Sequence, residues 1–222
     1  QKPEEVDASV TARVPVLLSR DDRYFQDAYQ GMPAEGYHRM FSNMLQHENI
    51  EILLGIKAED KIKLVPEDGV YFEGEKFDGE VIYTGEIDRL FHYCYGELPY
   101  RSLCFSFEHH EKEYYQEAGV VNYTVTEDYT RITEFKYLTG QNHKGTTIIK
   151  EYPLEYKREC GMIPYYAILN PENEELYQKY HELAEQFPNM YLIGRLAEYK
   201  YYNIDAIVLR ALLLAEQICS KK

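Results

Sequence analysis

Arginine and tyrosine occur close together at several points along this chain, and these residues are the ones best suited to binding chemistry. Guanidinium groups bind phosphate oxygens through two parallel hydrogen bonds, and tyrosine hydroxyls add neutral donors. One charge-assisted hydrogen bond contributes roughly 1.5–3 kcal/mol, so two arginines and three tyrosines could hold a diphosphate. The residues concerned are Arg13 with Tyr24, Arg101 after Tyr100, Arg131 in YTRITEFKY, Tyr165–Tyr166 in IPYYAIL, and Arg195 ahead of Tyr199, Tyr201 and Tyr202.

Each arginine also has a simpler interpretation. Arginine beside tyrosine is common as a cation–π contact or as a cross-strand pair, and tyrosine itself is a good strand former. The 23 tyrosines of the chain, which has no tryptophan, are therefore partly structural. Spacing in the sequence does not show whether the arginines and tyrosines converge on one ligand.

Other catalytic patterns are missing from the sequence. No two glycines are separated by one residue, which excludes a dinucleotide fingerprint, and neither HExxH nor GxSxG occurs. His109 and His110 in EHHEKE suggest either a metal site or a solvated loop, and the loop is favoured because adjacent strand residues face opposite ways. The four cysteines form no CxxC pair, so free thiols are expected.

Composition and charge limit the class of protein. The 222 residues are 45% hydrophobic and 28% charged, as in a globular protein, and the formal net charge is −14. Such acidity argues against nucleic acid and against an anionic membrane as partners, although a small anion could still bind where arginines converge. No apolar run approaches membrane-spanning length and QKPEEVDASV is not a signal peptide, which together predict a cytoplasmic protein.

The apolar periodicity predicts a mixed α+β fold. Helices are expected over Ala34–Leu45 and Pro171–Phe187, the second capped by Asn170, over the short stretch Ile87–Tyr95, and from about Ile204. A strand, a hairpin and a further strand (VIYTG) are expected between Ile50 and Thr84. The remaining predicted strands are Val10–Leu18, NMYLIG, and four that form an antiparallel sheet: SLCFSF, GVVNYTV, TRITEFKYL and GTTIIKEYPLEY.

Several long motifs resemble one enzyme family. They are SRDDRYFQDAYQGMPAEGY, YTGEIDRLFHYCYGELPYRSLCF, GVVNYTVTEDYTRITEFKY, KEYP, IPYYAILNPEN and LIGRLAEYKYYNIDAIVLRAL. In this order and spacing they are similar to UDP-galactopyranose mutases, from about Val6 to the C-terminus. These enzymes begin with a dinucleotide-binding βαβ unit that has no counterpart here, so the chain resembles only their C-terminal part.

The resemblance implies an isomerase that uses FAD without net redox change. Such enzymes interconvert UDP-galactopyranose and UDP-galactofuranose, and reduced FAD is thought to attack the anomeric carbon through N5, forming a flavin–sugar adduct and expelling UDP. The protein must then hold the departing diphosphate and position the sugar. UDP-galactose is the implied substrate, a homodimer is a further expectation, and the chain alone is expected to be inactive and to bind FAD poorly.

The resemblance also implies roles for individual residues. Arg13 and Arg131 match the arginines that clasp the diphosphate, and Tyr24, Tyr165 and Tyr201 match tyrosines that donate to the same phosphates, with Tyr166 an alternative to Tyr165. Arg195 matches an arginine close to the flavin, and Arg101 matches another arginine near the active site. Asn203 stands where aspartate is usual in the family; it can contact the ligand, cap the final helix, or do both.

The implied domain organisation divides the chain into an antiparallel sheet domain that binds substrate and parts of an α/β FAD-binding domain. Residues 1–33 supply a sheet-domain strand and a substrate-binding segment, 34–48 a helix, and 49–99 part of the FAD-binding domain with a hairpin and a short helix. Residues 100–170 form the sheet domain. Residues 171–222 return to the FAD-binding domain as a helix, a strand and the C-terminal helix.

Two other functions remain as alternatives. One is a non-catalytic, β-rich module that binds a nucleotide sugar or glycan through its arginines and tyrosines. The other is a different flavoprotein of related architecture, such as an amine oxidase relative, against which YTRITEFKY and GRLAEYKYYN both count.

Overall fold

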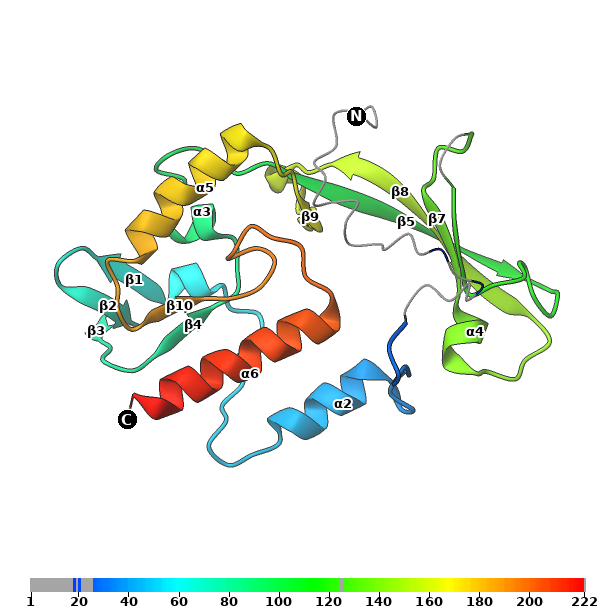
Figure 1. Ribbon diagram of the computed structural model, residues 1–222, viewed down its shortest axis with the longest axis horizontal. Helices are drawn as coiled ribbons and strands as arrows, with labels where there is room; N and C mark the ends of the chain where they lie inside the picture. Colours follow the sequence, from blue (N-terminus) through cyan, green and yellow to red (C-terminus); the bar gives the residue numbers. More distant parts are fainter. Residues whose placement is uncertain (1–17, 19, 21–25, 124–125, 222) are drawn as a thin grey trace. The chain divides into compact units, whose positions relative to one another are not determined.

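The computed structural model describes residues 18, 20, 26–123 and 126–221 (Figure 1). Arg13, Tyr24 and the predicted strand Val10–Leu18, apart from its last residue, lie outside the described residues. The chain divides into two compact units. One unit combines the described residues up to Ile52 with Cys104–Tyr152, and the other combines Leu53–Leu103 with the described residues from Pro153 onward.

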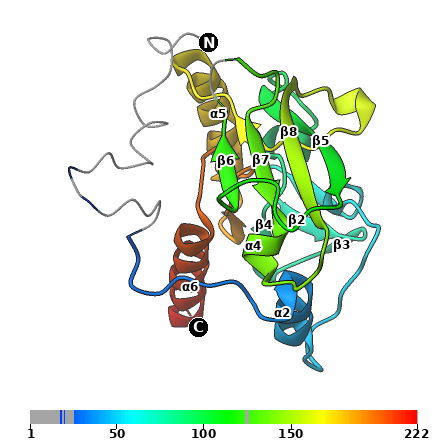
Figure 2. The same ribbon diagram turned by 90° about the vertical axis from the view of Figure 1, so that its right-hand side faces the viewer.

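A five-stranded sheet contains the strands that were predicted to form the antiparallel sheet, and its order is β6-β7-β8-β5-β9. Figure 2 shows β6, β7, β8 and β5 side by side. Three of its pairings, β6 with β7, β7 with β8, and β5 with β9, are antiparallel. Together with the helices this confirms the mixed α+β class. The strands are β5 (Tyr100–His110), β6 (Val120–Asn122), β7 (Arg131–Glu134), β8 (Thr146–Glu155) and β9 (Tyr166–Ala167).

The strand prediction for TRITEFKYL is wrong in its second half, because β7 ends at Glu134 and α4 (Phe135–Thr139) follows. Side chains explain the change. The buried Glu134 carboxylate accepts hydrogen bonds from the amides of Tyr115 and Gln116 at 2.8 and 3.0 Å. The Lys136 ammonium donates to the carbonyls of Glu113 and His143. These long-range bonds turn the chain where its apolar pattern still favours a strand.

The strand, hairpin and further strand expected between Ile50 and Thr84 are confirmed. After η2 (Ala58–Asp60), the strands β1 (Ile62–Val65), β2 (Gly69–Phe72) and β3 (Glu75–Lys76) form a three-stranded sheet, and β4 (Val81–Tyr83) follows. One other prediction of local structure is wrong. His109 and His110 lie at the end of β5 rather than in a loop. Within the described residues, no cluster of His, Cys, Asp and Glu has an arrangement suited to a metal ion.

The core of the second unit forms where helices cover a parallel pair of strands. β4 (Val81–Tyr83) and β10 (Met190–Leu192) pair in parallel, and α3 (Ile87–Leu90) contacts α5 (Pro171–Ala184), which lies beside it in Figure 1. As predicted, Asn170 caps α5, since its Oδ1 accepts from the Asn173 amide at 2.8 Å. The buried core side chains are Val70, Tyr83, Ile87, Leu90, Leu98, Tyr100, Tyr177, Tyr180, Phe187, Met190, Ala197 and Tyr199.

The predicted first and last helices are present as α2 (Gly36–Leu45) and α6 (Ile204–Ser220). α2 buries none of its residues and α6 buries only Leu214. The short helix η3 (Arg158–Cys160) follows β8. Among the helices of the described residues, none combines the length and apolar character needed to cross a bilayer. The four cysteines are free and exposed.

Candidate functional site

The segment that carries Arg195 is a compact turn between β10 and α6. Gly194 has φ +101°, a conformation that side chains rarely adopt, and its amide donates to the Glu198 carboxylate at 2.9 Å. Tyr199 also has a positive φ of 47°, and it is fully buried. Its hydroxyl donates to the Pro99 carbonyl at 2.6 Å. Tyr199 is therefore a packing residue, and it ties this turn to the segment just before β5.

Arg195 is held in place by its neighbours Tyr201 and Tyr202. Its Nε and Nη2 atoms donate to the Tyr202 carbonyl at 2.9 and 2.6 Å, and its guanidinium carbon lies 4.1 Å from the centre of the Tyr201 ring. The Tyr166 ring is stacked on the Tyr201 ring, with 6.0 Å between the ring centroids and 13° between the ring planes. Arg195, Tyr201 and Tyr166 therefore form a continuous stack built from two distant segments.

Arg101 lies in the same unit, on the strand that pairs with β9. It stands opposite Tyr166 in the register of β5 and β9, and its carbonyl accepts from the Tyr165 amide at 3.0 Å. Arg101 is exposed, and Tyr165 and Tyr166 are half-buried. The structure thus brings Arg101, Tyr165, Tyr166, Tyr201 and Arg195 into one connected set of contacts.

Arg131 belongs to the other unit, where it stands in the middle of a row across three strands. Its register partners are Asn122 on β6 and Glu151 on β8. Arg131 Nε donates to Asn122 Oδ1 at 3.0 Å, and Nη1 lies 3.7 Å from the Glu151 carboxylate. This row orients a guanidinium that remains 38% exposed, and this degree of exposure leaves it accessible to an anion.

Asn203 occupies the N-cap position of α6, as expected, with extended backbone angles of φ −76° and ψ 163°. Its side chain makes no capping hydrogen bond, however, so the expected capping role is wrong. The carbonyl of Asn203 accepts the first helical bond, from the Ile207 amide at 3.0 Å. The backbone alone starts this helix, and the Asn203 amide group is not used for capping.

Sequence reasoning missed several residues that the structure places in these contacts. Tyr166 was only an alternative to Tyr165, yet it is the one whose ring stacks on Tyr201. Asn122 and Glu151 are not predicted as site residues from the sequence, although they lie in the motifs GVVNYTVTEDYTRITEFKY and KEYP. Strand alternation alone could not identify them, because the register between strands is needed to place both beside Arg131.

The family follows from comparison with known proteins. Residues 1–201 match the family model described as UDP-galactopyranose mutase. The chain belongs to this family. Its members are flavin-dependent mutases that interconvert the pyranose and furanose forms of nucleotide sugars.

The relatives that match this chain are named for two different substrates. The chain is 36% identical over 220 residues to a UDP-galactopyranose mutase of Mycoplasma genitalium, covering 97% of this chain and 54% of that protein. It is 38% identical over 223 residues to a probable UDP-galactopyranose mutase of Klebsiella pneumoniae, covering 99% and 54%. A dTDP-fucopyranose mutase of Escherichia coli is 37% identical over 218 residues, covering 97% and 55%. The chain thus spans about half the length of the relatives it matches.

Proposed function

We propose that this chain supplies the substrate-binding part of a flavin-dependent mutase that interconverts UDP-galactopyranose and UDP-galactofuranose. The single observation that carries the proposal is the family match over residues 1–201, which contains the Arg195–Tyr201–Tyr166 stack. Arg131, Tyr165 and Tyr201 are proposed to bind the diphosphate, together with Arg13 and Tyr24, which lie outside the described residues. Asn203 is proposed to contact the same ligand.

Two arginines of the second unit are proposed to contact FAD. Two of the three nitrogens of Arg195 are used on the Tyr202 carbonyl, so its third nitrogen, Nη1, can donate to a cofactor while the guanidinium stays fixed. Arg101 is the second proposed cofactor-binding residue. The sequence has no glycine-rich phosphate cradle, so the remaining contacts to FAD must come from elsewhere. When bound, reduced FAD supplies the nucleophile for the anomeric carbon of the sugar.

The chain's own residues act by holding and orienting the substrate. Diphosphate departs and returns in a ring isomerisation, so it must remain bound while its bond to the sugar is broken. A guanidinium restrained by Asn122 and Glu151 loses little further freedom when it binds phosphate, and this favours tight retention. Tyrosine hydroxyls add donors without adding charge, so the product nucleotide sugar can still be released once the diphosphate has rejoined the sugar.

The test is an assay of the purified mutase polypeptide that contains this chain, with UDP-galactose and dTDP-fucose offered in parallel under reducing conditions. Conversion of the UDP-sugar between its two ring forms is expected. Preference for the dTDP-sugar would replace the proposed substrate, and failure to convert either would refute the proposed activity. The 222-residue chain alone serves as the control, and it should be inactive and colourless. A yellow preparation with stoichiometric flavin would contradict the expected weak FAD binding.

The main alternative is the non-catalytic module that binds a nucleotide sugar. Calorimetric titration with UDP would not separate it from the mutase, since both would bind. Turnover of the sugar ring separates them, because a module would bind UDP-galactose and leave it unchanged.

A further inference from the structure

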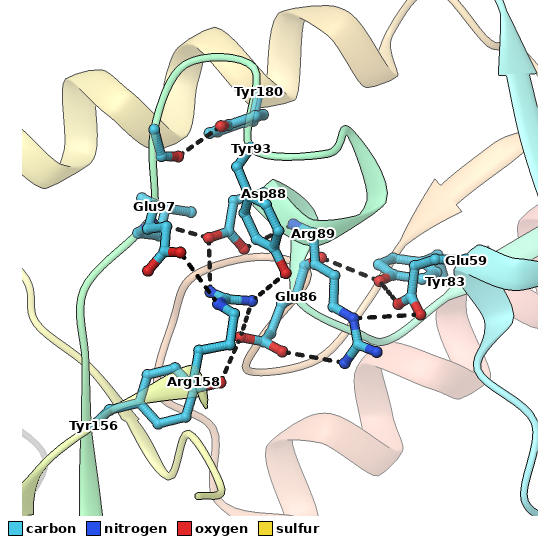
Figure 3. A network of polar contacts seen from close by, with 12 residues as sticks. Glu59, Tyr83, Glu86, Asp88, Arg89, Tyr93, Glu97, Tyr156, Arg158 and Tyr180 are labelled. Carbon is cyan, nitrogen blue, oxygen red and sulfur yellow. Dashed lines mark hydrogen bonds and ion pairs between the residues drawn. The ribbon is translucent and has the colours of Figure 1, made fainter. Parts of the chain in front are cut away.

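A buried polar network joins α3 to the end of β8, within the second unit (Figure 3). Arg158, on η3, reaches four acceptors, of which the Glu97 carboxylate is the most distant, at 3.7 Å from Nε. Its Nη2 lies 3.1 Å from the Asp88 carboxylate, its Nη1 lies 3.0 Å from the Glu86 carboxylate, and Nη1 also donates to the Tyr93 hydroxyl at 2.6 Å. Asp88 is fully buried and the Arg158 side chain is 19% exposed. A planar guanidinium makes these contacts from several nitrogens held in a fixed geometry, whereas an ammonium would have to make all of them from a single atom.

The Asp88 carboxylate also holds the chain that leads into β5. Besides binding Arg158, it accepts from the Leu98 amide at 2.9 Å and from the Arg89 amide at 2.9 Å. Leu98 lies three residues before Arg101 and is 1% exposed. Asp88 therefore fixes the backbone of this segment just before β5 begins at Tyr100.

The Arg158 end of the network leads into β9. From η3 the chain passes Gly161, and the Ile163 carbonyl then accepts from the Ser102 hydroxyl at 2.8 Å. Two residues later the Tyr165 amide donates to the Arg101 carbonyl, and Tyr166 stands opposite Arg101 in the sheet. The Asp88–Arg158 pair thus anchors both chain segments that meet at Arg101 and Tyr166.

We propose that Asp88 and Arg158 are positioning residues, which set where Arg101 and the Tyr165–Tyr166 segment are presented to the nucleotide sugar. The inference rests on the proposed function for the role of those presented residues. The claim that the ion pair holds the two segments in place does not depend on the proposed function, because the pair connects these segments whether or not a sugar binds. Burial raises the pKa of Asp88, while the hydrogen bond from the Leu98 amide and the Arg158 charge oppose that effect.

Arg89 provides a matched control from the same network. Its guanidinium lies 3.5 Å from the Glu59 carboxylate and 3.7 Å from the Glu86 carboxylate, and its side chain is 32% exposed. Glu86 is shared with Arg158 of η3, but the Asp88 carboxylate, which bonds both Arg158 and the Leu98 amide, is paired with Arg158 and not with the Arg89 guanidinium. Replacing Arg89 removes a positive charge from the same acidic surroundings and leaves both anchored segments tied to Asp88.

The first experiment measures amide hydrogen exchange in the 222-residue chain carrying R158Q, R158K or R89Q. Exchange at the Tyr165 and Leu98 amides should be about tenfold faster in R158Q than in R89Q, because local opening no longer breaks the ion pair. R158K keeps the charge but not the forked geometry, and it should lie between R158Q and the parent. If R158Q does not fold, R158K is compared with R89Q in its place. Equal exchange in R89Q and the Arg158 variants would overturn the inference.

The second experiment measures steady-state kinetics in the mutase polypeptide that contains this chain. R158Q should raise KM for UDP-galactose about tenfold, with R158K partly rescuing it and R89Q within about twofold of the parent. The same KM in R158Q and R89Q at matched thermal stability would show a merely structural role and overturn the positioning role. An inactive parent enzyme would refute the proposed function, and the exchange measurements would still decide whether the network holds the two segments.

Discussion

Arg131 is oriented by one neighbour on each adjoining strand. Asn122 accepts from its Nε atom, and Glu151 lies 3.7 Å from Nη1, so the side chain is restrained before any ligand arrives. A restrained guanidinium binds phosphate at a lower cost in conformational entropy than a free one. At the scale of single residues, the proposed diphosphate site therefore depends on polar neighbours as well as on the arginine itself.

Replacing Arg131 by alanine in the full mutase should lower kcat/KM for UDP-galactose on the order of 100-fold. The estimate assumes the loss of about two charge-assisted bonds, of which each contributes roughly 1.5 kcal/mol or more. Tyr202→Phe is the control, because Arg195 bonds to the Tyr202 carbonyl, which phenylalanine retains. Its kcat/KM should stay within a few-fold of the parent. Comparable losses in both variants, measured by steady-state kinetics, would refute the assignment of Arg131.

Two helices of the second unit begin at an asparagine, but only one of them is capped by its side chain. Asn170 Oδ1 accepts from the Asn173 amide at the start of α5, where Pro171 occupies the first turn. Asn203 precedes α6 without such a bond. At the scale of elements, the same residue type at the same position therefore has two different energetic roles.

Asn170→Ala should lower the free energy of unfolding by about 1 kcal/mol, as is typical for loss of an N-cap hydrogen bond. Asn203→Ala should change it by less than about 0.5 kcal/mol, because no capping bond is lost. Urea denaturation of the 222-residue chain, followed by circular dichroism, measures both variants. A loss at Asn203 as large as that at Asn170 would contradict the absence of a capping bond.

Local signals allowed the helices at Pro171 and Ile204 to be predicted from the sequence. At Pro171 a cap residue, a first-turn proline and apolar periodicity lie within a few residues of one another, whereas at Ile204 the signals are the periodicity and an asparagine at the N-cap position. The end of β7 could not be predicted, since it depends on bonds from Glu134 to the amides of Tyr115 and Gln116, far away in the sequence. The prediction of element boundaries is wrong where side chains bond to backbone groups that are distant in the sequence.

In the candidate site, too, some features could be predicted from the sequence and others required the structure. The arginine and tyrosine types were visible in the sequence, and the family resemblance supplied their proposed roles. The stacking of Tyr166 on Tyr201 and the row from Asn122 through Arg131 to Glu151 require tertiary pairing and strand register. Periodicity in one strand carries no information about its partner strand, so these contacts had to come from the structure.

At the scale of the whole chain, tyrosine is unusually abundant, with 23 tyrosines and no tryptophan. Several of these tyrosines form the core of the second unit rather than its surface. Tyr100, Tyr177, Tyr180 and Tyr199 are at most 4% exposed, and the Tyr100 ring makes edge contacts with Tyr156 and Tyr199. A core built in this way contains phenol groups that must stay neutral for the fold to persist.

The chain should therefore lose stability in alkali. Burial raises the pKa of Tyr83, Tyr100, Tyr177 and Tyr199, and it raises the pKa of Tyr156 to about 12. In the unfolded chain these phenols ionise near pH 10, roughly their ordinary value, so above it the unfolded state has lost protons that the folded state retains. The stabilising effect is present below about pH 10 and is lost as the pH rises through the folded-state values.

Urea midpoints measured between about pH 9 and about pH 11 should fall with rising pH, with tyrosinate absorbance appearing together with loss of the circular dichroism signal. Tyr156→Phe should make the decline shallower, because phenylalanine removes one of the phenols whose ionisation favours the unfolded state. A midpoint that stays constant or rises over this range would mean that the buried tyrosines ionise as readily in the folded chain as in the unfolded chain. The tyrosine-rich core would then be far more accessible to solvent than its packing indicates.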